Sequence, residues 1–484
     1  MNALKPAFQG RAAFTPTDEY RLLPFRFNNL GQRYIVTNDV GEYVLLERTD
    51  LADLVHRRLS PASAIYRTLK SRHFIMDRDS RATIDLLALK ARSRMARVAE
   101  FTALHMFVVT LRCDHSCHYC QVSRQSEDRD NFDMSAAHAE LAVEQVFRSP
   151  AEHLKIEFQG GEPLLNFALI RKIVEQAKML NQTHKRDLRF VIASNLTRLT
   201  DEILAFCAQH RISLSTSVDG PQSLHDMQRP IRSGSSHAMV VSSIERARLA
   251  LGPDSVSALM TTTPAALDRV EEIVDEYARL GFHSIFLRAL SPYGFAVKSL
   301  VRRYDADDWV AFYKRGLEHI LEINQRGYPM REEYTAVLLQ KIFCPTGTGY
   351  IDLQSPAGLG ISGIVYNYDG AVYASDEGRM LAEMGDTSFK LGYLGTDSYE
   401  DMLTSEQLLA PLEASVLESA PQCSDCAFLP YCGADPVFHK ATLGDWVGHK
   451  AFSSFCTKQT AVLSYLLERL DGDPAARAIM MGWL

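Results

Sequence analysis

The sequence predicts an α/β protein organised around parallel strands that are joined by crossover helices. Between about residues 105 and 325, short apolar runs alternate six times with amphipathic helical patterns, an order typical of a parallel sheet covered by helices. Six repeats are too few to close the eightfold barrel of this class, so we expect a laterally open, TIM-like (β/α)6 barrel. A chain of 484 residues, 46% of them hydrophobic, has room for this barrel and for further domains.

The repeats can be placed along the chain by the period of their apolar residues. The six expected strands are His105–Leu111, Leu154–Phe158, Leu188–Ala193, Ile212–Val218, Val256–Thr261 and Ile285–Leu290. The expected helices are Ser135–Phe147, Leu169–Leu180, Asp201–Gln209, His237–Leu251, Ala265–Leu280 and Asp307–Asn324. Folds of this kind gather their reactive groups where the strands end, so the residues that follow each strand are the candidate site.

Three cysteines follow the first strand. Cys113, Cys117 and Cys120 stand in a C-x3-C-x2-C spacing, with Tyr119 directly before the last of them. Three thiolates on one short loop can hold three irons of a four-iron cluster and leave the fourth iron open to a small chelating ligand. The alternative is a three-cysteine part of a zinc site whose fourth ligand lies elsewhere in the chain.

The second strand ends in a glycine-rich turn with a carboxylate. Gly160 and Gly161 precede Glu162 and Pro163. Paired glycines let the backbone approach a ligand closely, and a carboxylate can accept hydrogen bonds from an ammonium group. A plain Gly-Pro turn without a ligand is the competing interpretation.

Polar residues also follow the third and fourth strands. Ser194 and Asn195 end the third strand, and Ser217 lies at the end of the fourth, at the start of a Ser-x-Asp-Gly-Pro sequence. Arg229 comes shortly afterwards, and its planar guanidinium suits a carboxylate because it can bind both oxygens. Arg229 could equally form a surface ion pair with Asp226.

A second group of cysteines lies near the C-terminus. Cys423, Cys426 and Cys432 are close in sequence, and Cys456 follows after a longer interval. Four soft ligands close a metal site completely, as in iron–sulfur sites and in structural zinc sites, and both remain open. Since no signal peptide is recognisable, these cysteines are expected to be metal ligands rather than disulfide partners, whereas Cys207 is assigned to the core.

Composition argues against two classes of partner. The 52 basic and 59 acidic residues give a net charge of −7 and are mixed along the chain, so we expect no nucleic-acid binding. No apolar run reaches the roughly 18 residues needed to cross a membrane. Together with the absence of a signal peptide pattern, this predicts a cytoplasmic protein without membrane contact.

A separate small unit precedes the barrel. An Asn-Asp-Val-Gly turn, in which Gly41 suits a positive φ, lies between two strand patterns. Ser60 and Pro61 have the residue types of a helix N-cap and first helical position. The expected elements are strands at Arg33–Thr37 and Glu42–Leu46 and helices at Asp50–Arg58, from Ser60-Pro61 onward, and at Ser80–Val98.

Taken together, these motifs resemble the radical S-adenosylmethionine (SAM) superfamily, and the resemblance covers nearly the whole chain. The three-cysteine loop and the Gly-Gly-Glu-Pro turn are typical of that superfamily, and the run from Ser217 to Arg229 is similar to its peptide-modifying branch. The greatest likeness is to SPASM-domain maturases of ribosomally made peptides, particularly those of the His-Xaa-Ser system. The phrases that suggest this subfamily are Leu23-Pro24-Phe25-Arg26-Phe27, Thr37-Asn38-Asp39-Val40-Gly41-Glu42 and Phe286-Leu287-Arg288-Ala289-Leu290-Ser291-Pro292.

The resemblance implies three domains and a SAM-binding cluster. Residues 1–98 would form a winged-helix-like peptide-recognition domain, 99–330 the radical SAM barrel and 331–484 a SPASM-like domain. A [4Fe-4S] cluster on the three-cysteine loop would bind SAM and cleave it reductively to a 5′-deoxyadenosyl radical.

The same resemblance assigns the cofactor-binding residues. The Gly160–Pro163 loop would bind the methionyl amine of SAM, and Ser217 and Arg229 its ribose and carboxylate. Tyr119 would belong to the cluster motif, Ser194 and Asn195 would touch SAM, and Leu287 with Arg288 would support the adenine.

The C-terminal pattern departs from the family at the first of its two auxiliary clusters. Ser375 and Pro436 stand where cysteines are expected, and Cys344 is the one thiol left in that region. The slots of the second cluster are all filled, so the resemblance implies one auxiliary [4Fe-4S] cluster, with structural zinc as the alternative. Asp376, beside Ser375, is the candidate general base, provided that burial raises its pKa.

The resemblance therefore implies a radical SAM enzyme that modifies a precursor peptide containing His-Xaa-Ser triplets. Its expected partners are that peptide, an electron donor such as flavodoxin or ferredoxin, and a sister radical SAM maturase. Two alternatives stay open, namely a protein-modifying enzyme of the sulfatase-maturing kind and a non-catalytic, metal-stabilised peptide-binding scaffold.

Overall fold

Five of the six strands expected for the barrel form one parallel sheet. The computed structural model describes residues 19–232, 234–294 and 304–484, so parts of the expected domains at 1–18, 233 and 295–303 lie outside the described residues. The central strands are β6 (Leu104–Thr110), β7 (His153–Gly160), β8 (Asp187–Ala193), β9 (Ile212–Ser217) and β10 (Val256–Leu259). Neighbours in sequence are neighbours in the sheet, and all four pairs are parallel.

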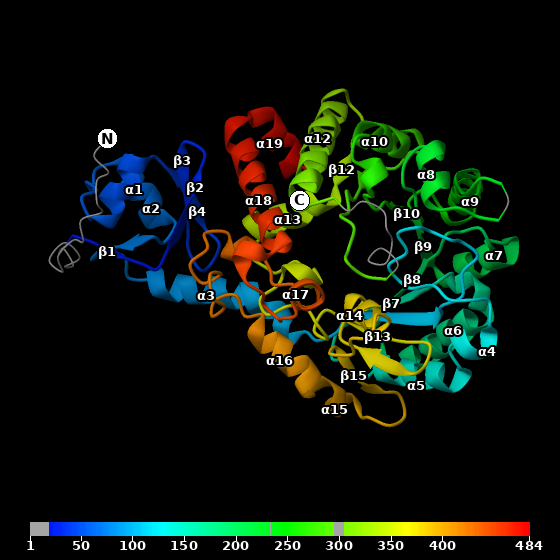
Figure 1. Ribbon diagram of the computed structural model, residues 1–484. Helices are drawn as coiled ribbons and strands as arrows, with labels where there is room; N and C mark the ends of the chain where they lie inside the picture. Colours follow the sequence, from blue (N-terminus) through cyan, green and yellow to red (C-terminus); the bar gives the residue numbers. More distant parts are fainter. Residues whose placement is uncertain (1–18, 233, 295–303) are drawn as a thin grey trace.

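The helices between these strands cover the outer face of the curved sheet (Figure 1). They are α4 (Arg129–Phe132), α5 (Ala136–Val146), α6 (Phe167–His184), α7 (Asp201–His210), α8 (Gln222–Gln228), α9 (Ser236–Leu251) and α10 (Val270–Arg279). Strand β6 is buried on both faces because Phe107 and Val109 join the core under the helices, whereas Met106 and Val108 join a second cluster on the opposite face. The mixed α/β fold with a largely parallel sheet is thus the one that the sequence predicts.

The sixth repeat differs from the prediction. Only Ser284–Ile285 forms a strand (β11), and it pairs with β12 (Arg331–Glu332) instead of β10. The reason is the buried Glu332, whose carboxylate accepts the Leu287 N–H at 3.1 Å and so removes that group from a strand ladder. One backbone bond, from Thr262 N–H to Arg288 C=O at 2.8 Å, still holds the segment beside the end of β10.

C-terminal strands extend the sheet on its other side. Strand β13 (Gly363–Tyr366) lies parallel to β6, and β14 (Ala371–Tyr373) and β15 (Lys390–Tyr393) continue antiparallel, giving an eight-stranded sheet. The remaining helices surround it and pack on the barrel. They are α12 (Ala306–Gln325), α13 (Glu333–Phe343), α14 (Asp376–Ala382), α15 (Tyr399–Leu403), α16 (Glu406–Ala414), α17 (Pro436–Leu443), α18 (Ser454–Gly472) and α19 (Pro474–Met481).

The N-terminal residues form a unit with a core of its own. Its elements are β1 (Arg21–Leu22), β2 (Arg26–Leu30), β3 (Arg33–Thr37), β4 (Tyr43–Leu46), α1 (Arg48–Val55), α2 (Ala64–Ser71), β5 (Ile75–Met76) and α3 (Thr83–Met95). Strands β2, β3 and β4 form an antiparallel sheet, which contains the predicted hairpin. The predicted helix start at Ser60-Pro61 is wrong, because the Ser63 hydroxyl accepts the Tyr66 N–H at 3.1 Å and caps α2 three residues later.

Hydrogen bonds that are wholly or partly buried join this unit to the C-terminal domain. Arg94, near the end of α3, donates to the carbonyls of Val40 and Lys341 at 3.0 Å and of Pro430 at 2.7 Å. The Tyr431 hydroxyl donates to the Gly41 carbonyl at 2.9 Å. Arg94 therefore connects the predicted hairpin turn to the C-terminal domain.

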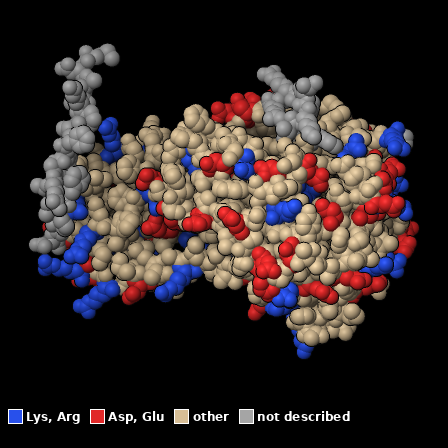
Figure 2. All heavy atoms as spheres, turned by 60° about the horizontal axis from the view of Figure 1, so that its bottom comes forward, with Lys and Arg blue, Asp and Glu red and all other residues tan. Residues whose placement is uncertain are grey.

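On the face of the molecule that Figure 2 shows, acidic and basic side chains are interspersed, and neither sign of charge covers the whole face. This agrees with the mixed charges of the sequence. Among the described residues, no helix combines the length and apolar character needed to span a membrane.

Candidate functional site

The three-cysteine loop leaves the end of β6 and is held by backbone hydrogen bonds. The N–H of Ser116 donates to the Pro230 carbonyl at 3.0 Å, and the N–H of His118 to the Gln228 carbonyl at 3.3 Å. The loop is therefore fixed against the chain that follows α8.

The start of the loop is anchored by a residue that the motif did not single out. Arg112 is buried and bonds both oxygens of Asp133, at 2.7 and 2.8 Å, and the Leu165 carbonyl at 3.0 Å. Such a two-pronged contact fixes the orientation of the guanidinium, and with it the chain next to Cys113.

The three thiols are half-buried and lie near one another. Burial raises the pKa of Cys117 to about 11, the Arg229 guanidinium opposes this effect, and the Cys120 thiol adds to it. Burial also raises the pKa of Cys113, and the nearby Glu162 carboxyl and Cys117 thiol raise it further. Three thiol donors on one loop, with a cation beside them, suit a cluster that carries negative charge and keeps one iron open.

The glycine turn after β7 packs directly on this loop. A Cβ on Gly161 would lie 2.3 Å from the Arg112 carbonyl oxygen, and a Cβ on Gly160 would lie 2.0 Å from that of Thr110. Both positions therefore require glycine. The contact brings Glu162 to the loop, because its N–H donates to the Arg112 carbonyl at 2.7 Å, and Pro163 begins the short turn that follows.

Glu162 is a fully buried carboxylate without a cationic side chain bonded to it among the described residues. It accepts the Ser194 hydroxyl at 2.7 Å, the Asn195 N–H at 2.8 Å and the Leu164 N–H at 3.0 Å. Burial raises its pKa to about 7, although these three donors oppose the shift. The group is thus prepared to receive a positive charge.

Ser194 and Asn195 donate hydrogen bonds to carboxylates that lie at the cysteine loop. Besides the contacts to Glu162, the Asn195 amide donates to Asp114 at 2.8 Å, and Asp114 also accepts the Thr197 hydroxyl and the Arg198 guanidinium at 2.9 Å. Burial works to raise the pKa of Asp114, but these donors hold it well below the usual range. The structure therefore places both residues in a network that orients Glu162 and the cysteine loop.

Tyr119 and Arg229 meet on Asp219, which lies just beyond the end of β9. The Tyr119 hydroxyl donates to the buried Asp219 carboxylate at 2.5 Å, and the Arg229 Nε donates to the same oxygen at 2.9 Å. The guanidinium also lies over the Tyr119 ring, 5.3 Å from its centre. The suggested Arg229–Asp226 surface pair is wrong, because Asp226 instead accepts the N–H of His237 at the start of α9.

Ser217 and Leu287 have different surroundings. The Ser217 hydroxyl is half-buried at the end of β9 and makes no hydrogen bond within the described part of the chain. Leu287 is fully buried, and a Cβ on Gly316 of α12 would lie 2.6 Å from its side chain. Its side chain thus packs against the barrel helix, and its expected contact with the adenine stays a prediction. Arg288 faces a cavity instead.

The four C-terminal cysteines lie within electrostatic reach of one another. Cys423 and Cys426 occupy successive turns, Cys432 follows a short 3-10 turn, and Cys456 lies in the first turn of α18. Burial raises the pKa of Cys432 to about 12, while the Lys341 ammonium lowers it and the thiols of Cys426 and Cys456 raise it further.

Cations surround this second group as well. Burial raises the pKa of the Cys423 and Cys426 thiols, whereas the Lys450 ammonium lowers the pKa of Cys423 and the Arg26 guanidinium lowers that of Cys426. Within the described ranges, no group of three or more His, Cys, Asp or Glu side chains is compact enough to hold one metal ion. Four thiol donors with cations beside them suit a negatively charged metal site.

The positions where cysteines are missing serve as helix starts. Ser375 is buried and caps α14 by accepting the Gly378 N–H at 3.0 Å, and Pro436 is the first residue of α17. Asp376, the expected general base, forms an ion pair with Arg379 at 3.2 Å, whereas the adjacent Glu377 faces a cavity. Glu377 was not foreseen, because the sequence does not fix which residue of a helix turn faces inward.

We predict that Asp219→Asn disrupts the site as a whole. The substitution leaves the Arg229 guanidinium buried without its counter-charge, which typically costs about 3–5 kcal/mol. Chemical denaturation should show a loss of this size, with reduced SAM binding. The control is Asp226→Asn. Because the Asp226 carboxylate is partly exposed, this variant should lose less of the free energy of unfolding. Equal stability of the two variants would contradict the role given to Asp219.

Sequence comparisons agree with this geometry. Residues 107–276 match the Radical SAM superfamily. The chain is 32% identical over 127 residues to an uncharacterized protein of Methanocaldococcus jannaschii, covering 26% of this chain and 41% of that protein. It is 19% identical over 211 residues to the radical SAM cyclopropyl synthase TigE of Paramaledivibacter caminithermalis, covering 41% of this chain and 42% of TigE. The chain thus spans about two-fifths of the length of these curated relatives.

Solved structures show the same fold over a larger part of the chain. Native anSMEcpe with bound AdoMet has a TM-score of 0.64 and 17% identity, covering 78% of this chain and 100% of that one. Streptococcus suis SuiB bound to the precursor peptide SuiA has a TM-score of 0.51 and 13% identity, covering 85% and 94%. Residues 107–276 of this chain therefore match the Radical SAM superfamily in sequence, and the chain shares its fold with these solved structures.

Proposed function

We propose that this chain is a radical SAM enzyme that reductively cleaves SAM and uses the 5′-deoxyadenosyl radical to modify residues of a ribosomally synthesised precursor peptide. The observation that carries the proposal is the buried Glu162 carboxylate beside the three-cysteine loop. Three donors orient it, and no cationic side chain among the described residues bonds to it. An ammonium group such as the methionyl amine of SAM would supply the missing charge.

The cofactor and the chain have separate tasks. A four-iron cluster on Cys113, Cys117 and Cys120 would supply the electron that cleaves SAM, received from a donor such as flavodoxin or ferredoxin. Glu162 would hold the amine. The Ser217 hydroxyl would be available to the ribose, and the terminal nitrogens of Arg229, which make no hydrogen bond among the described residues, to the carboxylate.

We further propose that the C-terminal cysteines hold one auxiliary four-iron cluster rather than zinc. The spacing of the four cysteines, which resembles the second auxiliary cluster of SPASM domains, supports this choice, as do the cations beside their thiols. A closed cluster has no open iron, so its tasks would be electron relay and stabilisation of the C-terminal domain.

The N-terminal unit would recognise the peptide by strand addition. Strand β2 lies at an edge of its sheet, and Phe27, Asn28 and Asn29 are exposed there. The Asn29 N–H donates to the Asn28 side chain at 2.9 Å, so β3 does not use it. A leader peptide could pair with this free edge. The SuiB–SuiA complex and the peptide-bound form of anSMEcpe support a peptide substrate. The sequence phrases noted above favour the His-Xaa-Ser type, in which a sister maturase would be a further partner.

The reaction class has a direct test. Anaerobically reconstituted protein should form 5′-deoxyadenosine from SAM and dithionite, and Cys113→Ala should abolish it because the open iron is lost. Cys207→Ala, which removes a buried thiol of α7 outside both cysteine groups, should stay active. The enzyme proposal fails if the unchanged protein forms no 5′-deoxyadenosine while Cys113→Ala retains the same iron content.

Metal analysis tests the auxiliary cluster. Two four-iron sites predict about eight irons for each chain. Cys426→Ala should retain about four and still bind SAM, while Cys344→Ala should keep the full number. Four irons with one tightly bound zinc in the unchanged protein would support the zinc alternative, and twelve would mean that other ligands complete a third site.

Strand addition predicts a specific effect of Asn29→Pro. Proline removes an N–H that points away from β3, so the sheet should survive while an added strand loses a partner. Binding of the precursor peptide, measured by fluorescence anisotropy, should weaken, and 5′-deoxyadenosine formation without peptide should not change. Unaltered peptide affinity would show that the peptide does not dock on β2.

A further inference from the structure

Two strands of the N-terminal sheet are bonded to the C-terminal cysteine segment (residues 423–432), which carries three of the four C-terminal cysteines. Arg26 of β2 donates through its Nε to the Ser424 carbonyl. The fully buried Thr37 of β3 donates its hydroxyl to the Ala427 carbonyl at 2.7 Å. Arg26 and Thr37 are partners in the ladder between β2 and β3. Both bonds therefore act on the same end of the β2–β3 hairpin.

The turn between β3 and β4 reaches the same segment. The Tyr431 hydroxyl donates to the Gly41 carbonyl, and Arg94, which also binds this turn, donates to the Pro430 carbonyl. Bonds to the N-terminal unit are thus spaced along the C-terminal cysteine segment from Ser424 to Tyr431. The position of the hairpin depends on the position of this segment.

The C-terminal cysteine segment has little regular structure of its own. Between α16 and α17, a stretch that is described throughout, the short 3-10 turn Leu429–Tyr431 is the one regular element. Irregular segments open locally at a small cost in free energy unless other contacts hold them. Metal binding to cysteines is coupled to the ordering of the chain that carries them, so an occupied metal site would hold this segment in place.

Arg26 also acts on a thiol of the metal site. Its guanidinium lowers the pKa of Cys426, which burial raises, and so favours the thiolate that binds metal. Its side chain is 15% exposed and forms an ion pair with Asp39 at 2.5 Å. A strand of the N-terminal unit therefore supplies both a hydrogen bond and a positive charge to the C-terminal cysteines.

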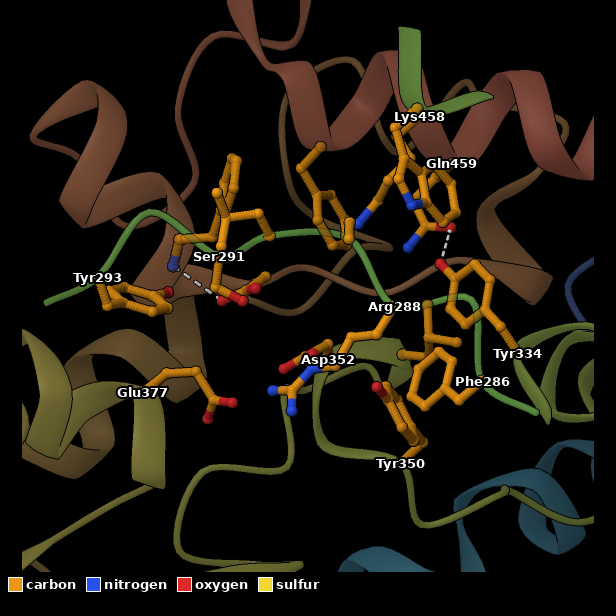
Figure 3. Close-up of a pocket in the computed structure, with 17 residues that line it drawn as sticks. Phe286, Arg288, Ser291, Tyr293, Tyr334, Tyr350, Asp352, Glu377, Lys458 and Gln459 are labelled. Atoms are coloured by element: carbon orange, nitrogen blue, oxygen red, sulfur yellow. Dashed lines mark hydrogen bonds between the residues drawn. The ribbon is translucent and has the colours of Figure 1, made fainter. Parts of the chain in front are cut away.

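The residues after Cys456 line a small cavity of about 100 Å³ at the barrel (Figure 3). Lys458 and Gln459 of α18 form one part of its wall, and Arg288, from the segment after β11, forms another. Gln459 accepts the Tyr334 hydroxyl at 2.6 Å, the bond drawn between these two residues in Figure 3. The four C-terminal cysteines therefore connect the N-terminal sheet with a cavity beside the barrel.

We propose that metal binding at the four C-terminal cysteines orders the β2–β3 hairpin and thereby prepares the free edge of β2 for the peptide. This inference rests on the proposed function, in which a peptide pairs with β2. An edge strand that is already held in its binding conformation loses less conformational entropy when the peptide docks, so the peptide binds more tightly. The metal site then serves recognition as well as its own domain, with iron–sulfur or with zinc.

The contacts also predict where order changes within the N-terminal unit. The bonds to the C-terminal cysteine segment come from β2, β3, the turn before β4 and Arg94. Helices α1 and α2 instead pack on the core that belongs to the unit itself. Loss of the metal should therefore loosen the β2–β3 hairpin and leave α1 and α2 unchanged.

Hydrogen–deuterium exchange followed by mass spectrometry tests the proposal on the reconstituted full chain. In Cys426→Ala, which lacks one ligand of the C-terminal site, the amides of residues 26–37 should exchange at least about tenfold faster than in the unchanged protein. The amides of α1 and α2 should keep their rates. Affinity for the precursor peptide, measured by fluorescence anisotropy, should fall about tenfold or more. Cys344→Ala, which removes a half-buried thiol not assigned to the site, should match the unchanged protein.

A second pair of variants keeps all four cysteines. Thr37→Val preserves the shape of the side chain but removes the hydroxyl bound to the Ala427 carbonyl, so exchange of the hairpin should be about tenfold faster, the effect of one buried hydrogen bond. Thr68→Val is the control, because the Thr68 hydroxyl bonds the Ala64 carbonyl within α2 at 3.1 Å. Its hairpin should exchange like that of the unchanged protein.

Equal exchange of residues 26–37 in the unchanged protein and in folded Cys426→Ala overturns the proposal, as does faster exchange of the hairpin without a loss of peptide affinity. If Cys426→Ala does not fold, Cys113→Ala is compared before and after removal of its remaining metal by chelation, and the same outcomes decide. Formation of 5′-deoxyadenosine by the unchanged protein is measured in the same preparations. If it occurs while the hairpin does not respond to metal, this inference alone fails, whereas its absence removes the proposed function and leaves the exchange result valid for the hairpin.

Discussion

The burial of the Glu162 carboxylate is the constraint on which the rest of the site depends. A charged group at that depth is stable only if donors surround it, and here they come from the end of β8 and from the turn after β7. Asn195, one of these donors, also bonds Asp114 inside the cysteine loop. The ends of three strands are thus tied together by one buried charge, and the loop that would hold the cluster is fixed by the same network.

A second buried charge supports the fourth strand in a similar way. Asp219 holds Arg229 and Tyr119, which belong to segments about a hundred residues apart from one another. The C-terminal domain then closes the site, because β13 continues the sheet beside β6 and α14 contacts the cysteine loop. Ser375 and Pro436 stand where the missing first auxiliary cluster would have cysteines, and each lies at the start of a helix instead.

The sequence predicted the parts that depend on local patterns. Apolar periodicity located the strands from β6 to β10 and the helices between them, and the cysteine spacings showed which thiols belong together. The sequence-based prediction was wrong where residues far apart in the chain bind the same backbone groups. Glu332 removes the Leu287 N–H from the sixth strand, and β13 gains its place by pairing with a strand some 250 residues earlier, which is not visible in its own four residues. Asp219 was missed because its role arises from partners brought together only by folding.

The most direct measurement is calorimetric titration of SAM into the reconstituted chain and into Glu162→Gln. Glutamine keeps the size of the side chain but removes the charge, so SAM affinity should fall about tenfold to a hundredfold, the effect of one charge-assisted hydrogen bond. Glu157→Gln, on the same strand and bonded to Gln159, should bind SAM normally. Undiminished SAM affinity in folded Glu162→Gln would contradict the central role of this buried carboxylate.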